Sequence, residues 1–478
     1  MAFLFILFPI LMAGITAIVP SNRWRPLLLP LTALPQLCFT VIVLFKPELT
    51  HTNTWLMLDP PGKIVLLLVN TLFFFCSLYA VSYLQYRKER DNRLFCICLN
   101  AFLGAISLVT WSQHLALMWV AIEATTLITA PLIYFNHNQL SIEAMWKYLL
   151  ISSVGIALAL LGTFFMAYSS MHGGMEATLS YVKLLKNAPL LSKTWLHLAF
   201  ILLFVGYGTK MGLAPMHTWK PDSYGESPGI IGAIFAGGLT SCSFLAFLRI
   251  YHICYAAGEF AYMSKTLIFM GLLSMATAAL FMIRQKDLKR MLAYSSIEHM
   301  GILTLGLGIG APAFFGILLH IISNGLTKGV LFLSIGNIHR AFGSKSIDRV
   351  HGAIRLLPFS GTIFLIGFLT ITGSPPFSPF VSLFAILNGA FQARKFFIAG
   401  LFLFLLLLVF IAMGATVLKA VQGSSPVPNR NKMTFRDTFA SCGPILGLLI
   451  TVCILGVYIP APLSELLNDA VRFLGGQP

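Results

Sequence analysis

Long apolar stretches, separated by short polar connections, recur along the whole of this chain. A helix needs about 20 apolar residues to cross the hydrocarbon core of a bilayer. The pattern therefore predicts an all-α integral membrane protein with about 14 transmembrane helices. The predicted spans begin near residues 2, 27, 62, 94, 114, 143, 195, 229, 265, 291, 313, 357, 397 and 438.

Glycine and proline interrupt two of these stretches, at residues 212–215 in the seventh span and at residues 373–376 in the twelfth. Proline breaks a helix, and the backbone groups that it frees are tolerated at membrane depth only inside protein or beside a watery cavity. Paired breaks are typical of transporters built from inverted repeats. Because the two breaks lie five spans apart, we expect two broken helices within two inverted five-helix repeats. Ordinary proline kinks are the alternative.

No segment is long and polar enough to form a separate soluble domain. We therefore expect one polytopic membrane domain over residues 1–478. Within it, the spacing predicts peripheral N-terminal helices over about 1–90, a first repeat over 94–252, a second repeat over 265–419, and a C-terminal helix and tail over 438–478.

Composition strengthens the membrane assignment, because 57% of the residues are hydrophobic and only 10% are charged. The net charge of +16 comes from cations scattered through short loops, which indicates membrane orientation and not nucleic-acid binding. Twenty cations, including Lys220, Lys289 and Arg290, fall on one predicted side, and ten, including Arg249, fall on the other. The richer side should face the cytoplasm, with both termini outside.

Glu123 and Lys210 lie within predicted spans, where an unpaired charge costs several kcal/mol. Lys210 comes just before the first break, so we expect it to face the interior and to pair with Glu123. A second positive group near the lysine would weaken this pair and favour release of its proton. The pair is thus a candidate proton switch, and a static ion pair that fixes packing is the alternative.

Other charged residues of the first half flank the spans. Glu143 and Lys147 are four residues apart, so they share a helix face and either pair near the interface or belong to the pathway. His217, Asp222 and Glu226 follow the first break, where they either line a hydrated funnel or cap a re-entrant turn.

The second half carries Glu298 and His299 in one span and His320, Asn324 and Lys328 in the next. Steps of four place the last three residues on one helical face. Histidine exchanges protons near neutral pH, and a desolvated lysine can also do so. The row therefore predicts a proton relay through intervening water, with a purely structural histidine as the alternative.

The chain shows no cofactor motif: it has no cysteine cluster for iron–sulfur, no dinucleotide-binding glycine turn and no histidine pair suited to haem. Its eight cysteines suggest neither a disulfide framework nor a zinc site. We expect no cofactor and no metal in this chain, and any redox chemistry would belong to partners.

Several phrases resemble a known family: LMWVAIEATT at 117–126, GTKMGLAPMHTW at 208–219, KRMLAYSSIEHMG at 289–301 and GSPPF at 373–377. The chain resembles the antiporter-like subunits shared by NADH:quinone oxidoreductase, Mrp sodium/proton antiporters and energy-converting hydrogenases. It resembles in particular the F subunit of hydrogenase-4-type complexes, and the similarity runs from about residue 90 to 390.

The resemblance implies a proton-translocating subunit of a larger complex in a prokaryotic inner membrane. Its partners would be other membrane subunits and peripheral redox subunits, with protons, or sodium, as the transported ion. By resemblance, Glu123 and Lys210 occupy the glutamate and lysine of the first half-channel, while His320 and Lys328 belong to the relay of the second.

Three positions depart from the family pattern. Ser241 and Asn324 stand where relatives have a lysine and a second histidine, and Leu383 stands where an acidic residue is common. Either protons leave by another group, or coupling is weak or absent. A non-redox cation/proton antiporter, a proton-driven inorganic-carbon uptake complex and a non-pumping membrane scaffold are therefore the competing functions.

Overall fold

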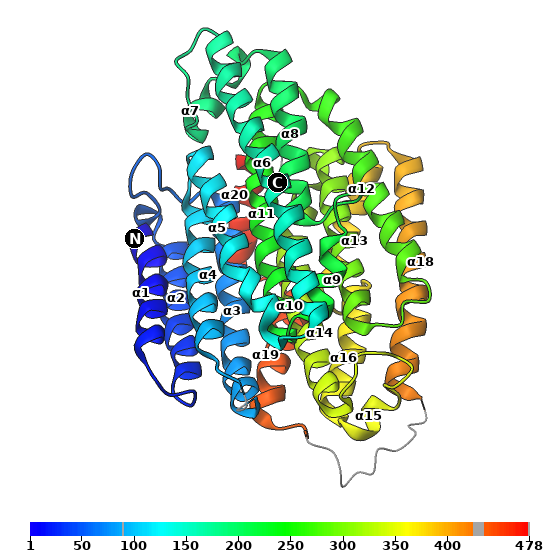
Figure 1. Ribbon diagram of the computed structural model, residues 1–478. Helices are drawn as coiled ribbons and strands as arrows, with labels where there is room; N and C mark the ends of the chain where they lie inside the picture. Colours follow the sequence, from blue (N-terminus) through cyan, green and yellow to red (C-terminus); the bar gives the residue numbers. More distant parts are fainter. Residues whose placement is uncertain (88–89, 424–434, 477–478) are drawn as a thin grey trace.

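The computed structural model describes residues 1–87, 90–423 and 435–476, which form a bundle of roughly parallel helices (Figure 1). The helices are α1 (Ala2–Ile18), α2 (Leu28–Phe45), α3 (Pro60–Tyr86), α4 (Arg93–Trp111), α5 (Leu115–Ile133), α6 (Gln139–His172), α7 (Tyr181–Lys186), α8 (Lys193–Met211), α9 (Trp219–Glu226), α10 (Gly229–Ile234), α11 (Thr240–Ala256), α12 (Phe260–Met282), α13 (Leu288–Ile309), α14 (Phe314–Phe342), α15 (Ala353–Leu356), α16 (Pro358–Ile371), α17 (Ser378–Gln392), α18 (Phe396–Gln422), α19 (Phe439–Val457) and α20 (Ala461–Phe473).

Among the described residues, 11 helices are long and apolar enough to cross a membrane. A π-helical turn at Phe235–Leu239 joins α10 to α11, so that this pair counts as one span. When α1, α13 and the α16–α17 pair are added to these 11 helices, the described residues contain the predicted number of spans. The all-α membrane fold is therefore confirmed.

Burial separates a central layer from a lipid-facing one. The most apolar stretches of the α14 helix and of the α10–α11 run are completely buried, as expected for helices at the centre of a bundle. In contrast, α18 leaves most of its apolar side chains uncovered, and Phe397 is 83% exposed. Figure 1 shows α18 along one flank of the bundle and α1 and α2 along the opposite flank.

Both predicted breaks are present. The first separates α8 from α9 and the second separates α16 from α17. Gly212 (φ 76°) and Gly373 (φ 80°) follow the last turns of α8 and α16, in a left-handed conformation that glycine adopts at little cost. Each break also contains a cis X–Pro bond. The prediction of two broken helices is confirmed, while the domain boundaries stay predictions.

Three cations that the sequence places in loops or at an interface lie inside the bundle. Lys220 is 0% exposed on α9, Arg249 is 1% exposed on α11 and Lys289 is 2% exposed on α13. The polar residues around Lys220 suggest a loop, but they form α9, which packs between α6 and α13. The loop placement of Lys220 and Arg249 is therefore wrong. Both described chain ends lie toward the end of the bundle that carries α7 (Figure 1), and which side that end faces stays a prediction.

Candidate functional site

The first buried lysine, Lys210, lies in the last turn of α8, which packs against α6. Its side-chain Nζ donates hydrogen bonds to Thr126 Oγ1 (2.7 Å) and to Tyr148 Oη (2.8 Å). The same ammonium lies 4.5 Å from the centroid of the Tyr148 ring, whose π-electrons favour a cation. The site therefore satisfies a buried ammonium with two hydroxyl groups and an aromatic face.

Glu123 reaches this lysine through a hydroxyl group. Thr126 Oγ1 donates to Glu123 Oε2 (3.1 Å), and Ser153 Oγ donates to Glu123 Oε1 (3.1 Å). We expected a direct ion pair, but among the described residues Lys210 contacts Thr126 and Tyr148 instead. Thr126 lies one helical turn after Glu123 on α5 and so stands between the two charges. The hydroxyl accepts from the lysine while it donates to the glutamate, which makes a continuous chain of hydrogen bonds.

The second buried lysine, Lys328, lies on the central helix α14 and is 0% exposed. Its Nζ donates to Ser295 Oγ (2.7 Å) and to the Leu292 carbonyl (3.5 Å), both on α13. Glu298, also on α13, is buried and interacts electrostatically with Lys328. The lysine of the second half thus has neutral hydrogen-bond partners, with an acidic residue nearby.

The two histidines form a pair. His299 Nδ1 lies 2.9 Å from His320 Nε2, and His320 Nδ1 lies 2.9 Å from Ser382 Oγ on α17. Ser382 Oγ donates to the Pro379 carbonyl (3.0 Å), so its oxygen accepts from His320 Nδ1. His320 Nε2 then accepts from His299 Nδ1, which leaves His299 Nε2, 4.0 Å from Glu298 Oε2, free of a proton in the neutral pair. The chain of hydrogen bonds can take up a proton at His299.

Asn324 lies between His320 and Lys328 on α14, as the spacing predicts, but it does not connect them directly. Both polar atoms of its side chain are buried without a hydrogen-bond partner among the described residues. His320 instead bonds across to α13 and α17. Leu383 lines a small apolar cavity of about 220 Å³ between α16, α17 and α18, while the preceding residue, Ser382, provides the polar contact.

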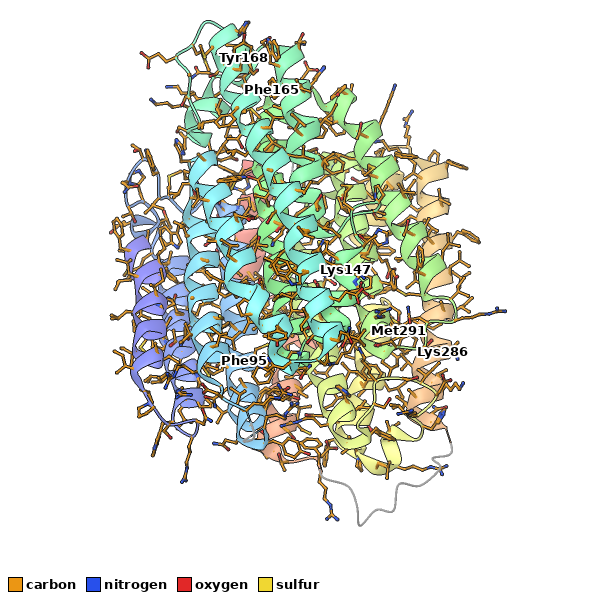
Figure 2. The ribbon with its side chains drawn as sticks, in the orientation of Figure 1. Phe95, Lys147, Phe165, Tyr168, Lys286 and Met291 are labelled. Atoms are coloured by element: carbon orange, nitrogen blue, oxygen red, sulfur yellow. The ribbon has the colours of Figure 1, made fainter. Side chains whose placement is uncertain are left out.

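Glu143, Lys147 and Asp222 belong to an ion-pair network. Lys147 Nζ lies 2.6 Å from Glu143 Oε1 and 2.9 Å from Asp222 Oδ2, and Arg290 Nη2 lies 2.7 Å from Asp222 Oδ1. The network joins α6 to α9 and α13, and Figure 2 labels Lys147 on α6. The Lys147 side chain is 45% exposed, and such pairs contribute little each. The contacts favour the pairing role of Glu143 over a pathway role.

Glu226 and His217 have different surroundings. Lys345 Nζ lies 2.8 Å from Glu226 Oε1 and 3.1 Å from Asp287 Oδ2. The His217 ring packs near Phe281 and Tyr294, and in the described part of the chain it makes no hydrogen bond to Asp222 or Glu226. Asp222 and Glu226 line one small cavity, and His217 is not among its lining residues.

One buried ion pair was not predicted. Arg249 on α11 donates from Nε to Asp59 Oδ2 (2.9 Å) and from Nη2 to Asp59 Oδ1 (2.8 Å). The same guanidinium donates to the carbonyls of Val109, Thr110 and Ser112 at the end of α4. This arrangement fastens α11 to the start of α3 and the end of α4. A bidentate arginine at this spacing carries no local sequence signal, because its partner lies 190 residues away.

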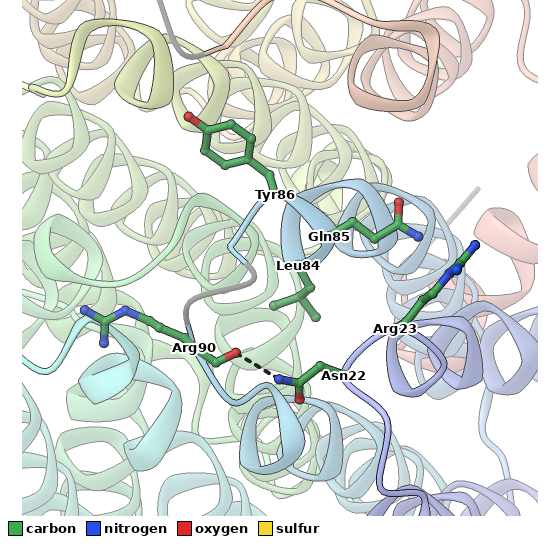
Figure 3. A pocket seen from close by; sticks show the side chains of 6 residues that line it. All are labelled: Asn22, Arg23, Leu84, Gln85, Tyr86 and Arg90. Carbon is green, nitrogen blue, oxygen red and sulfur yellow. Dashed lines mark hydrogen bonds between the residues drawn. The ribbon is translucent and has the colours of Figure 1, made fainter.

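A separate hollow of about 830 Å³ lies near the end of α3 (Figure 3). Asn22, Arg23, Gln85 and Arg90 are among its lining residues, and Asn22 Nδ2 donates to the Arg90 carbonyl at 3.5 Å. The lining includes none of the predicted pathway residues. In the same described ranges, no group of three or more histidine, cysteine, aspartate or glutamate side chains is placed to hold a metal.

The fold and these buried charges define a class: a polytopic helical membrane protein with two broken helices and a buried lysine beside each half of its core. The model of the family described as "NADH:quinone oxidoreductase/Mrp antiporter, TM" matches residues 112–410, and the chain belongs to this family. It is thus an antiporter-like membrane subunit of the class found in complex I, Mrp and hydrogenase-type complexes.

Individual relatives agree with this assignment. The "Hydrogenase-4 component F homolog" of Methylacidiphilum infernorum (isolate V4) is 33% identical over 470 residues, which cover 96% of this chain and 97% of the relative. A subunit of the Mrp complex from Dietzia sp. DQ12-45-1b superimposes with a TM-score of 0.87 at 18% identity, with 99% and 97% of the two chains covered. A subunit of respiratory complex I from Thermus thermophilus gives a TM-score of 0.84 at 22% identity, with 100% of both chains covered. These two structures belong to multisubunit membrane complexes.

Proposed function

We propose that this chain is a proton-translocating membrane subunit of a hydrogenase-4-like or NADH:quinone oxidoreductase-like complex in a prokaryotic inner membrane. Peripheral redox partners supply the energy, and the chain itself moves protons without a cofactor of its own. The name of the hydrogenase-4 relative supports this choice of complex. Both termini are proposed to lie outside. Because α7 lies at the same end of the bundle as both described chain ends (Figure 1), a single cysteine at position 186 on α7 should react with an impermeant reagent added from outside.

The observation that carries the proposal is the hydrogen-bonded chain from Lys210 through Thr126 to Glu123. A hydroxyl group that accepts from one charge and donates to the other can pass a proton between them. The pair also responds to its surroundings, because a second positive charge near Lys210 favours release of its proton. This is the switch that a coupled pump needs.

The second half completes the path. Lys328, whose hydrogen-bond partners are neutral, accepts or releases a proton. The His299–His320 pair then extends the path to α17. Histidine suits this role because its two nitrogen atoms can take up and release protons at opposite edges of the ring. Ser382 ends the chain of hydrogen bonds beside the second break, where Leu383 offers no titratable group.

A second candidate is a subunit of a sodium/proton antiporter. Glu123, Thr126 and Ser153 place carboxylate and hydroxyl oxygen atoms close together. Hard cations such as sodium prefer oxygen ligands of this kind. In this candidate, sodium competes with the proton at Glu123.

Proton movement across vesicles that contain the intact complex tests both candidates. A pH-sensitive dye follows wild type, Lys210→Met and the matched control Lys183→Met, with and without sodium, and mass spectrometry identifies the co-purifying peripheral subunits. We expect Lys210→Met to abolish proton movement at normal abundance of the complex, while Lys183→Met has no effect. Redox subunits and indifference to sodium favour the first candidate, whereas a sodium requirement favours the second.

A double variant, Glu123→Gln with Lys210→Met, provides the contrary outcome. It removes both charges and so leaves no buried ion uncompensated. If it assembles and moves protons at the wild-type rate, the switch is refuted. Absence of proton movement in the wild-type complex would favour a scaffold.

A further inference from the structure

Lys220 is a third fully buried lysine, and its ammonium has a main-chain partner. Its Nζ donates to the carbonyl of Met211, the last residue of α8, at 2.6 Å. Among the described residues, no carboxylate lies within ion-pair distance of this ammonium. The carbonyls at a helix C-terminus carry partial negative charge, which stabilises a cation without a full counter-charge. The C-terminal end of α8 therefore holds the Lys220 ammonium in the first break.

The break is shaped to admit this side chain. A Cβ atom added at Gly212 would lie 2.6 Å from Lys220 Cδ and 3.1 Å from its Nζ. Glycine at this position thus ends α8 in a left-handed conformation and also leaves room for the lysine stem. A larger residue would push the ammonium away from the Met211 carbonyl.

Lys220 also lies between the two halves. Its α9 helix packs against α6 of the first half and α13 of the second. Its ammonium lies 5.8 Å from the Tyr224 ring, and it interacts electrostatically with Lys328 and His299. Two positive charges at such positions disfavour each other in a buried environment. A proton on Lys328 therefore opposes a proton on Lys220.

We propose that Lys220 is a proton carrier that links the Lys210 site to Lys328 and His299. The inference rests on the proposed function. In the transfer step, one N–H bond of the Lys220 ammonium breaks and one N–H bond forms at the neutral Lys328 amine, with water molecules carrying the proton between them. One positive charge thus moves from the first half to the second. The simpler role would be structural, with Lys220 only capping the end of α8.

Arginine separates the two roles, because it keeps the positive charge and the N–H donors but does not release its proton in proteins. The intact complex would carry Lys220→Arg or Lys220→Met. The matched control is Lys289→Arg, since Lys289 is also buried and donates to a main-chain carbonyl, that of Ser227, at 2.9 Å. Proton movement and complex abundance are measured for each variant.

We expect at least a tenfold loss of proton movement in Lys220→Arg and Lys220→Met, and no loss in Lys289→Arg. Wild-type proton movement in Lys220→Arg would overturn the proposal and leave the capping role. If Lys220→Met does not assemble, Lys220→Arg decides. If the wild-type complex moves no protons, the proposed function has failed. If wild type moves protons and Lys210→Met does not, normal movement in Lys220→Arg refutes only the role of Lys220.

Discussion

Each half of the bundle contains a broken helix and a buried lysine, but the two lysines have different hydrogen-bond partners. In the first half, Thr126 joins Lys210 to the carboxylate of Glu123. In the second, Lys328 bonds to the Ser295 hydroxyl and a carbonyl, while Glu298 lies nearby without a bond to it. In the first half, a hydroxyl group therefore connects the buried lysine to a carboxylate. In the second half, the buried lysine has neutral hydrogen-bond partners, and a separate pair of histidines forms its own chain of hydrogen bonds. Similar backbones thus satisfy a buried lysine in two different ways.

A similar contrast is found in the side-chain contacts that hold helices together in each half. Arg249 in the first half forms a buried bidentate pair with Asp59. In the second half, Lys395 Nζ at the start of α18 donates to neutral groups, Ser264 Oγ (3.0 Å) and the Gly308 carbonyl (2.8 Å). Removal of one partner from a buried ion pair leaves an uncompensated charge, whereas removal of a cation from neutral partners does not.

The largest expected effect therefore concerns Arg249. Arg249→Met should lower stability by about 3–5 kcal/mol, because it leaves Asp59 buried and charged. Lys395→Met should cost only about 1 kcal/mol, the value of a typical net hydrogen bond. Thermal unfolding of the purified complex in detergent measures both. Equal shifts in the unfolding temperature would mean that the two halves are fastened alike, which contradicts the comparison.

An intermediate effect should follow from removal of the bridging hydroxyls. Thr126→Val keeps the shape of the side chain but breaks the chain from Lys210 to Glu123, so proton movement should fall about tenfold, as for loss of about 1.4 kcal/mol. Ser295→Ala leaves Lys328 its carbonyl partner, so the loss should be smaller. Dye-monitored proton movement, normalised to complex abundance, tests this order, and a larger loss in Ser295→Ala would reverse it.

The smallest effect lies in the connection between the halves, after α11. Glu259 Oε1 forms an ion pair with Lys193 Nζ (2.8 Å), and Glu259 Oε2 lies 2.7 Å from His197 Nε2. These two contacts lower the pKa of Glu259. A carboxylate with a lowered folded-state pKa adds stability above its unfolded-state pKa, and this stability is lost as the pH falls through the folded-state value.

Wild type should therefore exceed Glu259→Gln in stability by up to about 1 kcal/mol at pH 7, and the difference should vanish in acid. Unfolding temperatures of both proteins between neutral and acidic pH would measure it. A difference that grows as the pH falls has the wrong sign and would exclude this role for Glu259.

Sequence by itself determined the spans, the two breaks and the buried charges within apolar stretches. Charge inside an apolar segment is costly, so Glu123, Lys210 and Lys328 are visible from their neighbours alone. Glycine and proline mark the breaks for a similarly local reason, since proline lacks the backbone N–H donor and glycine readily adopts the left-handed conformation that ends a helix.

Only the tertiary structure decided which groups meet. Thr126, Tyr148, Ser295 and Ser382 are ordinary hydroxyl residues in the sequence, and packing between helices selects them as partners. Lys220 lies among polar residues typical of a loop, and it is buried because the break folds α9 back into the bundle. Arg249 finds Asp59 because α11 and α3 pack together. Helix formation follows from local pattern, whereas these hydrogen bonds and ion pairs depend on distances between segments that are remote in the chain.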